Sequence, residues 1–214
     1  MIVDVISDLH GHYPKLEGGD LLIVAGDLTA QDTQGQHNDF REWVSEQNYK
    51  CKLFIGGNHD NYLTTYIPYP KDIFFRTGTY LCDSGCEFEG LKIWGSPWTL
   101  AFKDMNPKCK AFTCKTEAQL ERKFEKIPGD TDILVTHSPP WGIFDECVQG
   151  NQIKSVGSRS LRAQVMCIAP ALHVFGHIHE NGGQVKQSVV TKFVNASHVD
   201  EWYRPINKPV RVIL

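Results

Sequence analysis

Five short segments of the chain combine acidic, amide and imidazole side chains in patterns suited to metal binding. Carboxylate oxygen, amide oxygen and imidazole nitrogen are the ligands that borderline divalent metals such as manganese, iron and zinc accept in proteins. One catalytic ion needs only three or four protein ligands if it keeps an open position. The segments offer too many ligands for one ion and a suitable number for two, the arrangement that hydrolyses phosphate esters. The candidate ligands are Asp8, His10, Asp27, Asn58, His137, His177 and His179.

Each segment follows a short apolar run that is typical of a strand buried on both faces. In an open α/β sheet the loops at the carboxyl ends of the strands gather at one edge, so we expect these side chains to meet there. Neighbouring glycines allow the backbone to turn sharply enough to present them. The runs are IVDVI before Asp8 and His10, LLIVA before Asp27, KLFI before Asn58, DILV before His137, and LHVF before His177 and His179.

Each segment taken alone has an ordinary structural explanation. A D-x-H such as Asp8-Leu9-His10 is commonly a solvated strand end, and a Gly-Asp such as Gly26-Asp27 is commonly a turn. Gly57-Asn58-His59-Asp60 is compatible with a tight turn that holds Asn58 in a left-handed conformation. The order of the five segments, each after a strand-like run, is what favours a metal site.

Helical periodicity and hairpin patterns lie between the strand-like runs. Parallel strands dominate the prediction in the first half of the chain and hairpin strands in the second half. These elements predict an α/β fold in which two mixed β-sheets pack as a sandwich flanked by helices. We expect helices within residues 37–47, 116–127 (with Thr116 as N-cap) and 158–170, a hairpin within 86–96 that turns near Gly90, and further strands within 182–197 and 209–214.

Composition limits the class of protein. The chain has 214 residues, of which 41% are hydrophobic and 22% are charged, which suits a single globular domain over residues 1–214. Its formal net charge of −3 argues against a protein that holds long nucleic acid by charge alone. Residues 1–6 have a strand pattern rather than that of a leader peptide, and no apolar run could span a bilayer, so we expect a cytoplasmic protein with no membrane partner.

The cysteines indicate reduced thiols rather than a disulfide framework. There are seven of them, an odd number, and no C-x-x-C pair occurs. Cys82 with Cys86 and Cys109 with Cys114 offer the alternative of a structural zinc site, but their spacings suit zinc poorly. We expect small, partly buried side chains.

The five segments together resemble the calcineurin-like metallophosphoesterase superfamily. Its pattern is D-x-H, G-D, G-N-H-[DE], a later H and G-H-x-H, and all five parts occur in this order from Asp8 to His179. The flanking text LKIWGSPW, GDTDILVTHSPPWGIFD, LHVFGHIHENGG and TKFVNAS is similar to the metallophosphoesterase-domain-containing subgroup, which includes small phosphodiesterases.

The resemblance implies two divalent ions per chain, of which Mn²⁺ is favoured and Fe, Zn or Mg are alternatives. It implies that Asp27 bridges the two ions. It also implies that His59 lies near the substrate phosphate without binding metal, with Asp60 or a backbone group steadying it. The implied ligands of the first ion are Asp8, His10 and His179, and those of the second are Asn58, His137 and His177.

The sequence also departs from one branch of the superfamily. Protein phosphatases carry an arginine soon after the Gly-Asp, whereas this chain has GDLTAQDTQG there, which argues against that activity. Arg159 and Arg162, at a predicted helix start, are candidate substitutes for binding phosphate, and a solvated helix face is the alternative. His12 lies near enough in sequence to contact substrate or to be a surface residue. Three loop aromatics, Trp98, Trp141 and Phe144, are candidates to stack on a nucleobase or to cover the core.

The expected function is hydrolysis of small phosphodiesters such as nucleotides, by attack of a hydroxide that bridges the metals. His59 is expected to donate a proton to the leaving oxygen or to stabilise charge on the phosphoryl group. The alternatives are a phosphomonoesterase of broad specificity and a relative that binds metal or nucleotide with weak or no turnover. The sequence does not predict the oligomeric state.

Overall fold

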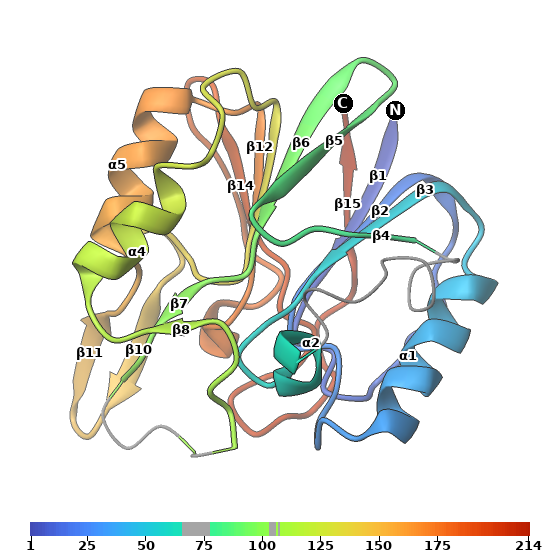
Figure 1. Cartoon of the computed structure of the whole chain (residues 1–214), viewed down its shortest axis with the longest axis horizontal. Helices are drawn as coiled ribbons and strands as arrows, with labels where there is room; N and C mark the ends of the chain where they lie inside the picture. Colours follow the sequence, from blue (N-terminus) through green and yellow to red (C-terminus); the bar gives the residue numbers. More distant parts are fainter. Residues whose placement is uncertain (66–77, 103–105, 107) are drawn as a thin grey trace.

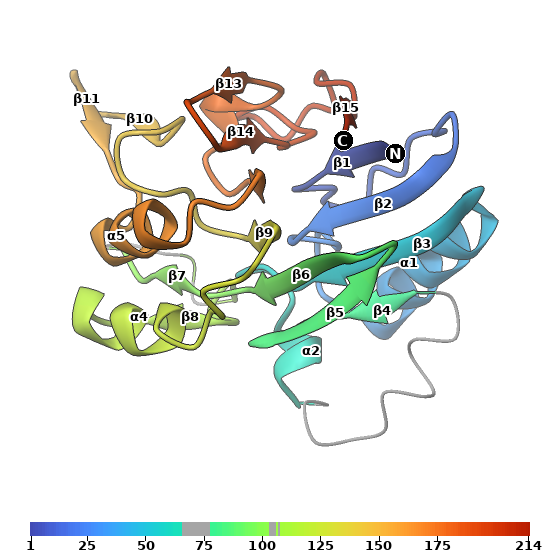
Figure 2. The ribbon, with the colours of Figure 1, turned by 90° about the horizontal axis from the view of Figure 1, so that it is seen from above.

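Two β-sheets pack face to face with helices on their outer sides, as the sequence predicts (Figures 1 and 2). The structure is a computed structural model, and it describes residues 1–65, 78–102, 106 and 108–214. Within these residues, no helix is long and apolar enough to cross a lipid bilayer.

The first sheet contains the strands that precede Asp8, Asp27 and Asn58. Its three central strands are parallel to one another, and the last strand of the chain lies antiparallel to the first. The strand order is β15 (Val210–Ile213), β1 (Ile2–Ile6), β2 (Gly19–Ala25), β3 (Tyr49–Ile55) and β4 (Thr79–Tyr80).

The second sheet contains the strands that precede His137 and His177. Its four central strands are parallel, and a hairpin strand lies at each edge. The second half of the chain therefore contributes parallel strands as well as hairpins, and one strand both closes a hairpin and joins the parallel group. The order is β13 (Val185–Gln187), β14 (Lys192–Asn195), β12 (Leu172–Phe175), β9 (Ile133–Thr136), β6 (Leu91–Ser96) and β5 (Ser84–Phe88).

The three longer helices of the described residues begin at side-chain caps. The hydroxyls of Thr33, Thr116 and Ser158 each accept a hydrogen bond from a backbone N–H in the first turn, which satisfies a group that the helix leaves unpaired. The third helix ends at Ala169, which is in a left-handed conformation before Pro170. The helices are α1 (Gln34–Glu46), α4 (Glu117–Phe124) and α5 (Arg159–Ile168); a short α2 (Asn61–Thr65) follows β3.

Two small paired elements were not predicted from the sequence. The parallel pair β7 (Thr99–Leu100) and β8 (Thr113–Cys114) and the hairpin of β10 (Glu146–Gln149) and β11 (Gln152–Ser155) lie below α4 and α5 in Figure 1. They are too short or too exposed to produce a hydrophobic period.

Apolar side chains from the inner faces of both sheets form the central core. Separate apolar clusters lie between the first sheet and α1, and between the second sheet and α4 and α5. Strands with buried side chains on both faces explain why their sequences are almost continuously apolar. The central core includes Val3, Val5, Leu21, Ile23, Leu53, Ile55, Ile93, Ile133, Val135, Leu172, Val174 and Val194.

The two sheets approach closely at Gly95 of β6. A Cβ at this position would lie 2.4 Å from Leu81 Cβ and 2.8 Å from Ile55 Cγ2, both of which belong to the first sheet's side of the core. The glycine therefore allows a close contact that a larger residue would push apart.

We expect Gly95→Ala to lower the free energy of unfolding by about 1–3 kcal/mol, because the added methyl overpacks the contact between the sheets. Gly129→Ala is the matched control, since a Cβ there has no neighbour within 4 Å. Urea denaturation followed by circular dichroism measures both variants. Equal stability of the two would contradict the close contact.

Candidate metal centre

The predicted ligands gather at one end of both sheets. Asp8, Asp27 and Asn58 follow β1, β2 and β3 of the first sheet, while His137 and His177 follow β9 and β12 of the second. Each set lies at the carboxyl ends of parallel strands, which is why residues far apart in sequence meet. A 3₁₀ turn, η1 (His179–Asn181), carries the last predicted ligand.

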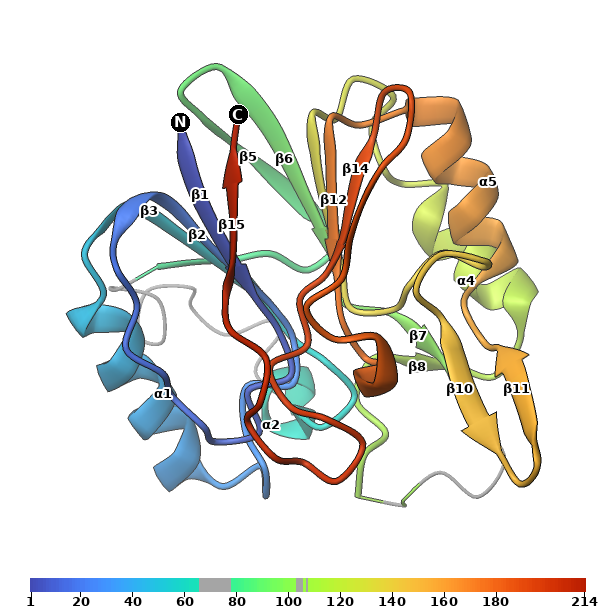
Figure 3. The same ribbon diagram turned by 180° about the vertical axis from the view of Figure 1, so that it is seen from behind.

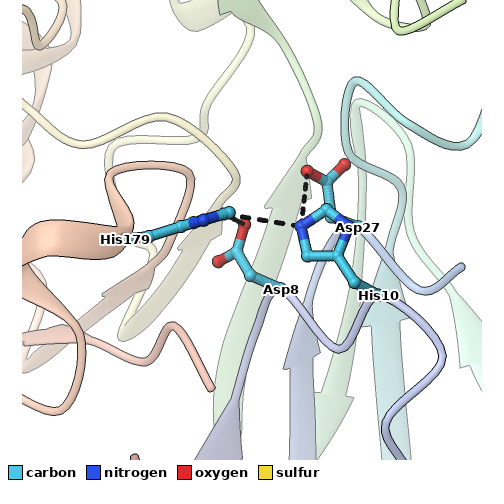
Figure 4. A group of neighbouring side chains, drawn as sticks. All are labelled: Asp8, His10, Asp27 and His179. Atoms are coloured by element: carbon cyan, nitrogen blue, oxygen red, sulfur yellow. Dashed lines mark hydrogen bonds and ion pairs between the residues drawn. The ribbon is translucent and has the colours of Figure 1, made fainter. Parts of the chain in front are cut away.

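Four of these side chains form a first donor group, shown in Figure 4. One ligand atom from each of Asp8, His10, Asp27 and His179 lies within 4.8 Å of the others. The Nε2 atoms of His10 and His179 are 3.4 Å apart, and His179 Nε2 is 3.2 Å from Asp8 Oδ1. His10 Nε2 lies 3.7 Å from Asp27 Oδ2.

A second donor group lies on the other side of Asp27. The same oxygen, Asp27 Oδ2, is 3.5 Å from His137 Nε2, and that nitrogen is 3.1 Å from Asn58 Oδ1. The ring of His177 is beside that of His137, with centroids 5.0 Å apart. The structure therefore brings all seven predicted ligands together, with Asp27 between His10 and His137.

The chemistry of these donors fits a pair of divalent cations. Each group mixes carboxylate or amide oxygen with imidazole nitrogen, the combination that borderline divalent metals accept. The carboxylates of Asp8 and Asp27 are 0% and 1% exposed, and buried negative charge requires a compensating cation. Within the described residues, His10 Nδ1 is buried with no hydrogen-bond partner. The protein alone thus leaves the polar groups of this site incompletely satisfied.

The surrounding charges keep the two carboxylates ionised. Burial raises the pKa of Asp8, but the hydrogen bond and charge of His179 outweigh it and hold that pKa well below its usual range. Burial likewise opposes ionisation of Asp27, and the charges of His137 and His59 outweigh it and hold its pKa low. The centre therefore attracts cations.

The imidazoles divide into two classes. Burial lowers the pKa of His10 and of His177 to about 3, so both rings are neutral near neutral pH and offer lone pairs to a metal. Burial also disfavours the charged form of His137, but the charge of Asp27 outweighs it and raises the pKa of His137 to about 9. Metal binding at His137 would therefore release a proton.

Backbone geometry places the ligands close together. Asp8, His10, Asp27 and His177 have φ of 51°, 43°, 49° and 69°, in the left-handed region that non-glycine residues seldom occupy. Such strain persists only where the surroundings fix it, and it concentrates at functional sites.

Glycines give the ligands their space. A Cβ on Gly57 would lie 2.2 Å from Asp27 Oδ1, and one on Gly176 would lie 2.0 Å from Asp8 Oδ2. Any side chain at either position would displace a carboxylate from the site.

Hydrogen bonds fix the orientation of the ligands. Asp8 Oδ2 accepts from Ser197 Oγ at 2.8 Å and from the backbone N–H of His177 at 3.0 Å. Asp27 Oδ1 accepts from the backbone N–H of His59 at 2.8 Å. His137 Nδ1 lies 3.0 Å from the carbonyl of Ala25, so it donates there, and Nε2 is the nitrogen that faces Asn58 and Asp27. Ser197 ends the segment TKFVNAS, but it was not among the predicted site residues.

His59 lies at the edge of the centre with an unexpected partner. Its Nε2 is 4.0 Å from Asp27 Oδ2, and its Nδ1 is 3.4 Å from Cys109 Sγ. The carboxylate of Asp60 instead accepts from the backbone N–H groups of Gly57 and Leu28, at 2.8 and 3.1 Å, so it ties the loops after β2 and β3 together. Among the described residues, the side chain hydrogen-bonded to the His59 ring is thus Cys109.

A cleft of about 700 Å³ opens beside the metal-ligand groups. Arg159 lies in its wall with the guanidinium 4.2 Å from the centre of the Trp141 ring. The described residues that line the cleft do not include His12, which is exposed, or Arg162, which is half-buried.

The other two loop aromatics do not line the cleft. Trp98 is half-buried, donates to Asp83 and has Lys123 Nζ 3.5 Å from its ring centre. Phe144 is half-buried beside Phe175. The positions of Trp98 and Phe144 favour the alternative that these rings cover the apolar core.

Comparisons with known proteins identify the family to which the chain is similar. The sequence model of the calcineurin-like phosphoesterase family matches residues 1–181. Human metallophosphoesterase domain-containing protein 1 is 30% identical over 236 residues, which covers 98% of this chain and 69% of the relative. The UPF0046 protein C25E10.12 of Caenorhabditis elegans is also 30% identical, with coverage of 98% of this chain and 78% of the relative.

Solved structures share the fold at low sequence identity. The protein TT1561 of Thermus thermophilus has a TM-score of 0.64 at 14% identity and covers 91% of this chain and 88% of its own. Phosphopantetheinyl hydrolase from Mycobacterium tuberculosis has a TM-score of 0.62 at 15% identity and covers 99% of this chain and 95% of its own.

We expect Asp27→Asn to reduce the manganese bound per chain, because it removes the charge shared by the two donor groups at nearly constant volume. Elemental analysis after dialysis against Mn²⁺ measures the loss. Asp145→Asn is the matched control, since Asp145 is a carboxylate of equal burial, 1% exposed, that accepts from Gly142 and Gly157 away from the ligands. An unchanged metal content in Asp27→Asn would contradict a bridging position.

Proposed function

Since the chain belongs to the calcineurin-like phosphoesterase family, a family of metal-dependent phosphoesterases, we propose that it is a phosphodiesterase that hydrolyses small phosphodiesters such as nucleotides. The observation that carries the proposal is the position of Asp27, whose Oδ2 lies 3.7 Å from His10 Nε2 and 3.5 Å from His137 Nε2. One carboxylate between two donor groups is the arrangement that two-metal hydrolysis requires.

The proposed ligand assignment follows the two donor groups. Asp8, His10 and His179 would hold the first ion, Asn58, His137 and His177 would hold the second, and Asp27 would be shared by both. We propose Mn²⁺ because the donors mix oxygen and nitrogen. When bound, the ions supply a nucleophile from water near neutral pH and offset charge on the phosphoryl oxygens.

His59 is proposed to protonate the leaving oxygen. It lines the cleft and lies beside Asp27 without joining either donor group. In its protonated form the ring donates Nδ1–H to Cys109 Sγ and carries a second proton on Nε2, the nitrogen nearer to Asp27, which it can give to the leaving oxygen and so become neutral. Its backbone N–H donates to Asp27 Oδ1 at 2.8 Å, so the backbone of His59 is anchored to a proposed metal ligand.

The cleft supports a diester over a monoester. It extends from the ligands past Leu100, Phe102 and Trp141, which gives a second ester substituent apolar surface to contact. Arg159 is the proposed anion-binding residue in this wall. Substrate contact by His12 and Arg162 stays a prediction from the sequence.

The proposed setting is the cytoplasm, where the free cysteines seen in the structure stay reduced. We further propose that residues 1–214 act as one domain, because both sheets contribute to one central core and both supply metal ligands.

We expect activity to be lost with chelator and restored by Mn²⁺. The restored protein should hydrolyse bis(4-nitrophenyl) phosphate with a higher kcat/KM than 4-nitrophenyl phosphate. The reverse preference would favour a phosphomonoesterase. Bound manganese with no hydrolysis of either ester would favour a binding protein.

We expect His59→Ala to lower kcat by about 10²–10⁴, the usual contribution of general acid catalysis. The manganese content should not change, because the His59 ring belongs to neither donor group. Parallel loss of metal and activity would show that His59 is a ligand instead.

A further inference from the structure

Tyr203 lies against the ligand side chains of the first donor group. Its ring centroid is 4.8 Å from that of His10 and 5.4 Å from that of His179, and the planes are nearly perpendicular in both pairs. The ring of His59 is 6.2 Å away. Tyr203 lines the cleft and is 48% exposed, so it borders both the ligands and the space for substrate.

The loop that carries Tyr203 is internally braced. It joins β14 to β15 and lies at the same end of the sheets as η1 (Figure 3). The Asp200 side chain, 3% exposed, accepts from the backbone N–H of Trp202 and of Arg204 at 3.0 and 2.8 Å, and from the Arg204 guanidinium. The Tyr203 N–H donates to the Asp200 carbonyl at 2.9 Å. The loop therefore holds Tyr203 in a defined place.

Two further features fix Tyr203 relative to the metal ligands. Its φ of 62° is left-handed, a conformation that a bulky residue keeps only when its surroundings enforce it. At the start of the loop, Ser197 Oγ donates to Asp8 Oδ2 at 2.8 Å. The loop and the first donor group are thus hydrogen-bonded to each other.

The cleft is short of groups that bind anions. Arg159 is the sole lysine or arginine among the described residues that line it, and its guanidinium lies on Trp141. Among the described residues, the Tyr203 hydroxyl forms no hydrogen bond with the protein. A tyrosine hydroxyl both donates and accepts hydrogen bonds, so this one is available to a bound ligand.

We propose that Tyr203 contacts the substrate and that its hydroxyl donates a hydrogen bond to a phosphoryl oxygen of the bound ester. The inference rests on the proposed function, since it assigns a group for the phosphate at the same site. A neutral donor beside the metal ligands strengthens phosphate binding and adds no positive charge that would repel the metal ions.

The test compares Tyr203→Phe with wild type, because this change removes the oxygen and keeps the ring that packs on His10 and His179. Trp202→Phe is the control: Trp202 is the exposed neighbour in the same loop, stacks on Arg204 and does not line the cleft. Three quantities are measured on Mn²⁺-loaded protein: manganese content, the Kd of inorganic phosphate by calorimetry, and kcat/KM for bis(4-nitrophenyl) phosphate.

We expect Tyr203→Phe to keep its manganese, to raise the phosphate Kd about tenfold and to lower kcat/KM about tenfold, the usual effect of one hydrogen bond to a charged group. Trp202→Phe should match wild type in all three. Wild-type phosphate affinity in Tyr203→Phe would overturn the proposal, and so would loss of manganese, which would make the hydroxyl a support for the ligands.

The phosphate measurement keeps this inference separate from the proposed function. If wild-type protein hydrolyses no ester, the phosphodiesterase proposal fails. A tenfold weaker phosphate affinity in Tyr203→Phe would still support the hydrogen bond under those conditions, and equal affinity would still overturn it.

Discussion

The carboxylate of Asp27 lies buried between imidazoles that come from different sheets. A buried carboxylate is costly, so its surroundings must compensate its charge. Removing a carboxylate from water costs several kcal/mol even after relaxation, and Asp8 adds a second buried charge nearby. The charges of His179 and His137 lower the pKa of the two carboxyls, whereas burial lowers the pKa of His10 and of His177 so that these two rings are neutral. Divalent cations bound at these donors would take over the role of the charged histidines.

Local structure around the ligands follows from this requirement. The left-handed residues and the buried carboxylate of Asp60, which joins two loops, oppose stability. The glycines beside the carboxylates limit substitution, because a methyl group there would collide with a ligand. The apolar sandwich beneath them supplies the stability that holds these features in place. The strands therefore provide the stability of the fold, and the strained loops at one end of them carry the candidate site.

The sequence predicted most of what lies at strand ends. Asp8, Asp27, Asn58 and His137 follow apolar runs whose burial is strong enough to define strands, so their meeting could be anticipated. Ser197, Cys109 and Tyr203 could not be predicted to lie at the site, since they come from loops with no periodicity and reach it only through long-range packing. Long-range packing of loops also determines the hydrogen bonds of Asp60 and the partner of the His59 ring, so the sequence did not predict them. The two mixed sheets were predicted, but the pairing of β14 on both sides was not, because a strand of four residues carries no sequence signal for its partners.

Each donor group contains side chains from both sheets. His179 of the second sheet faces Asp8 and His10 of the first, and His137 faces Asn58 and Asp27 in the same way. The close approach of the sheets at Gly95 therefore bears on the site as well as on the core. A substitution that pushed the sheets apart would draw the ligands of one sheet away from those of the other.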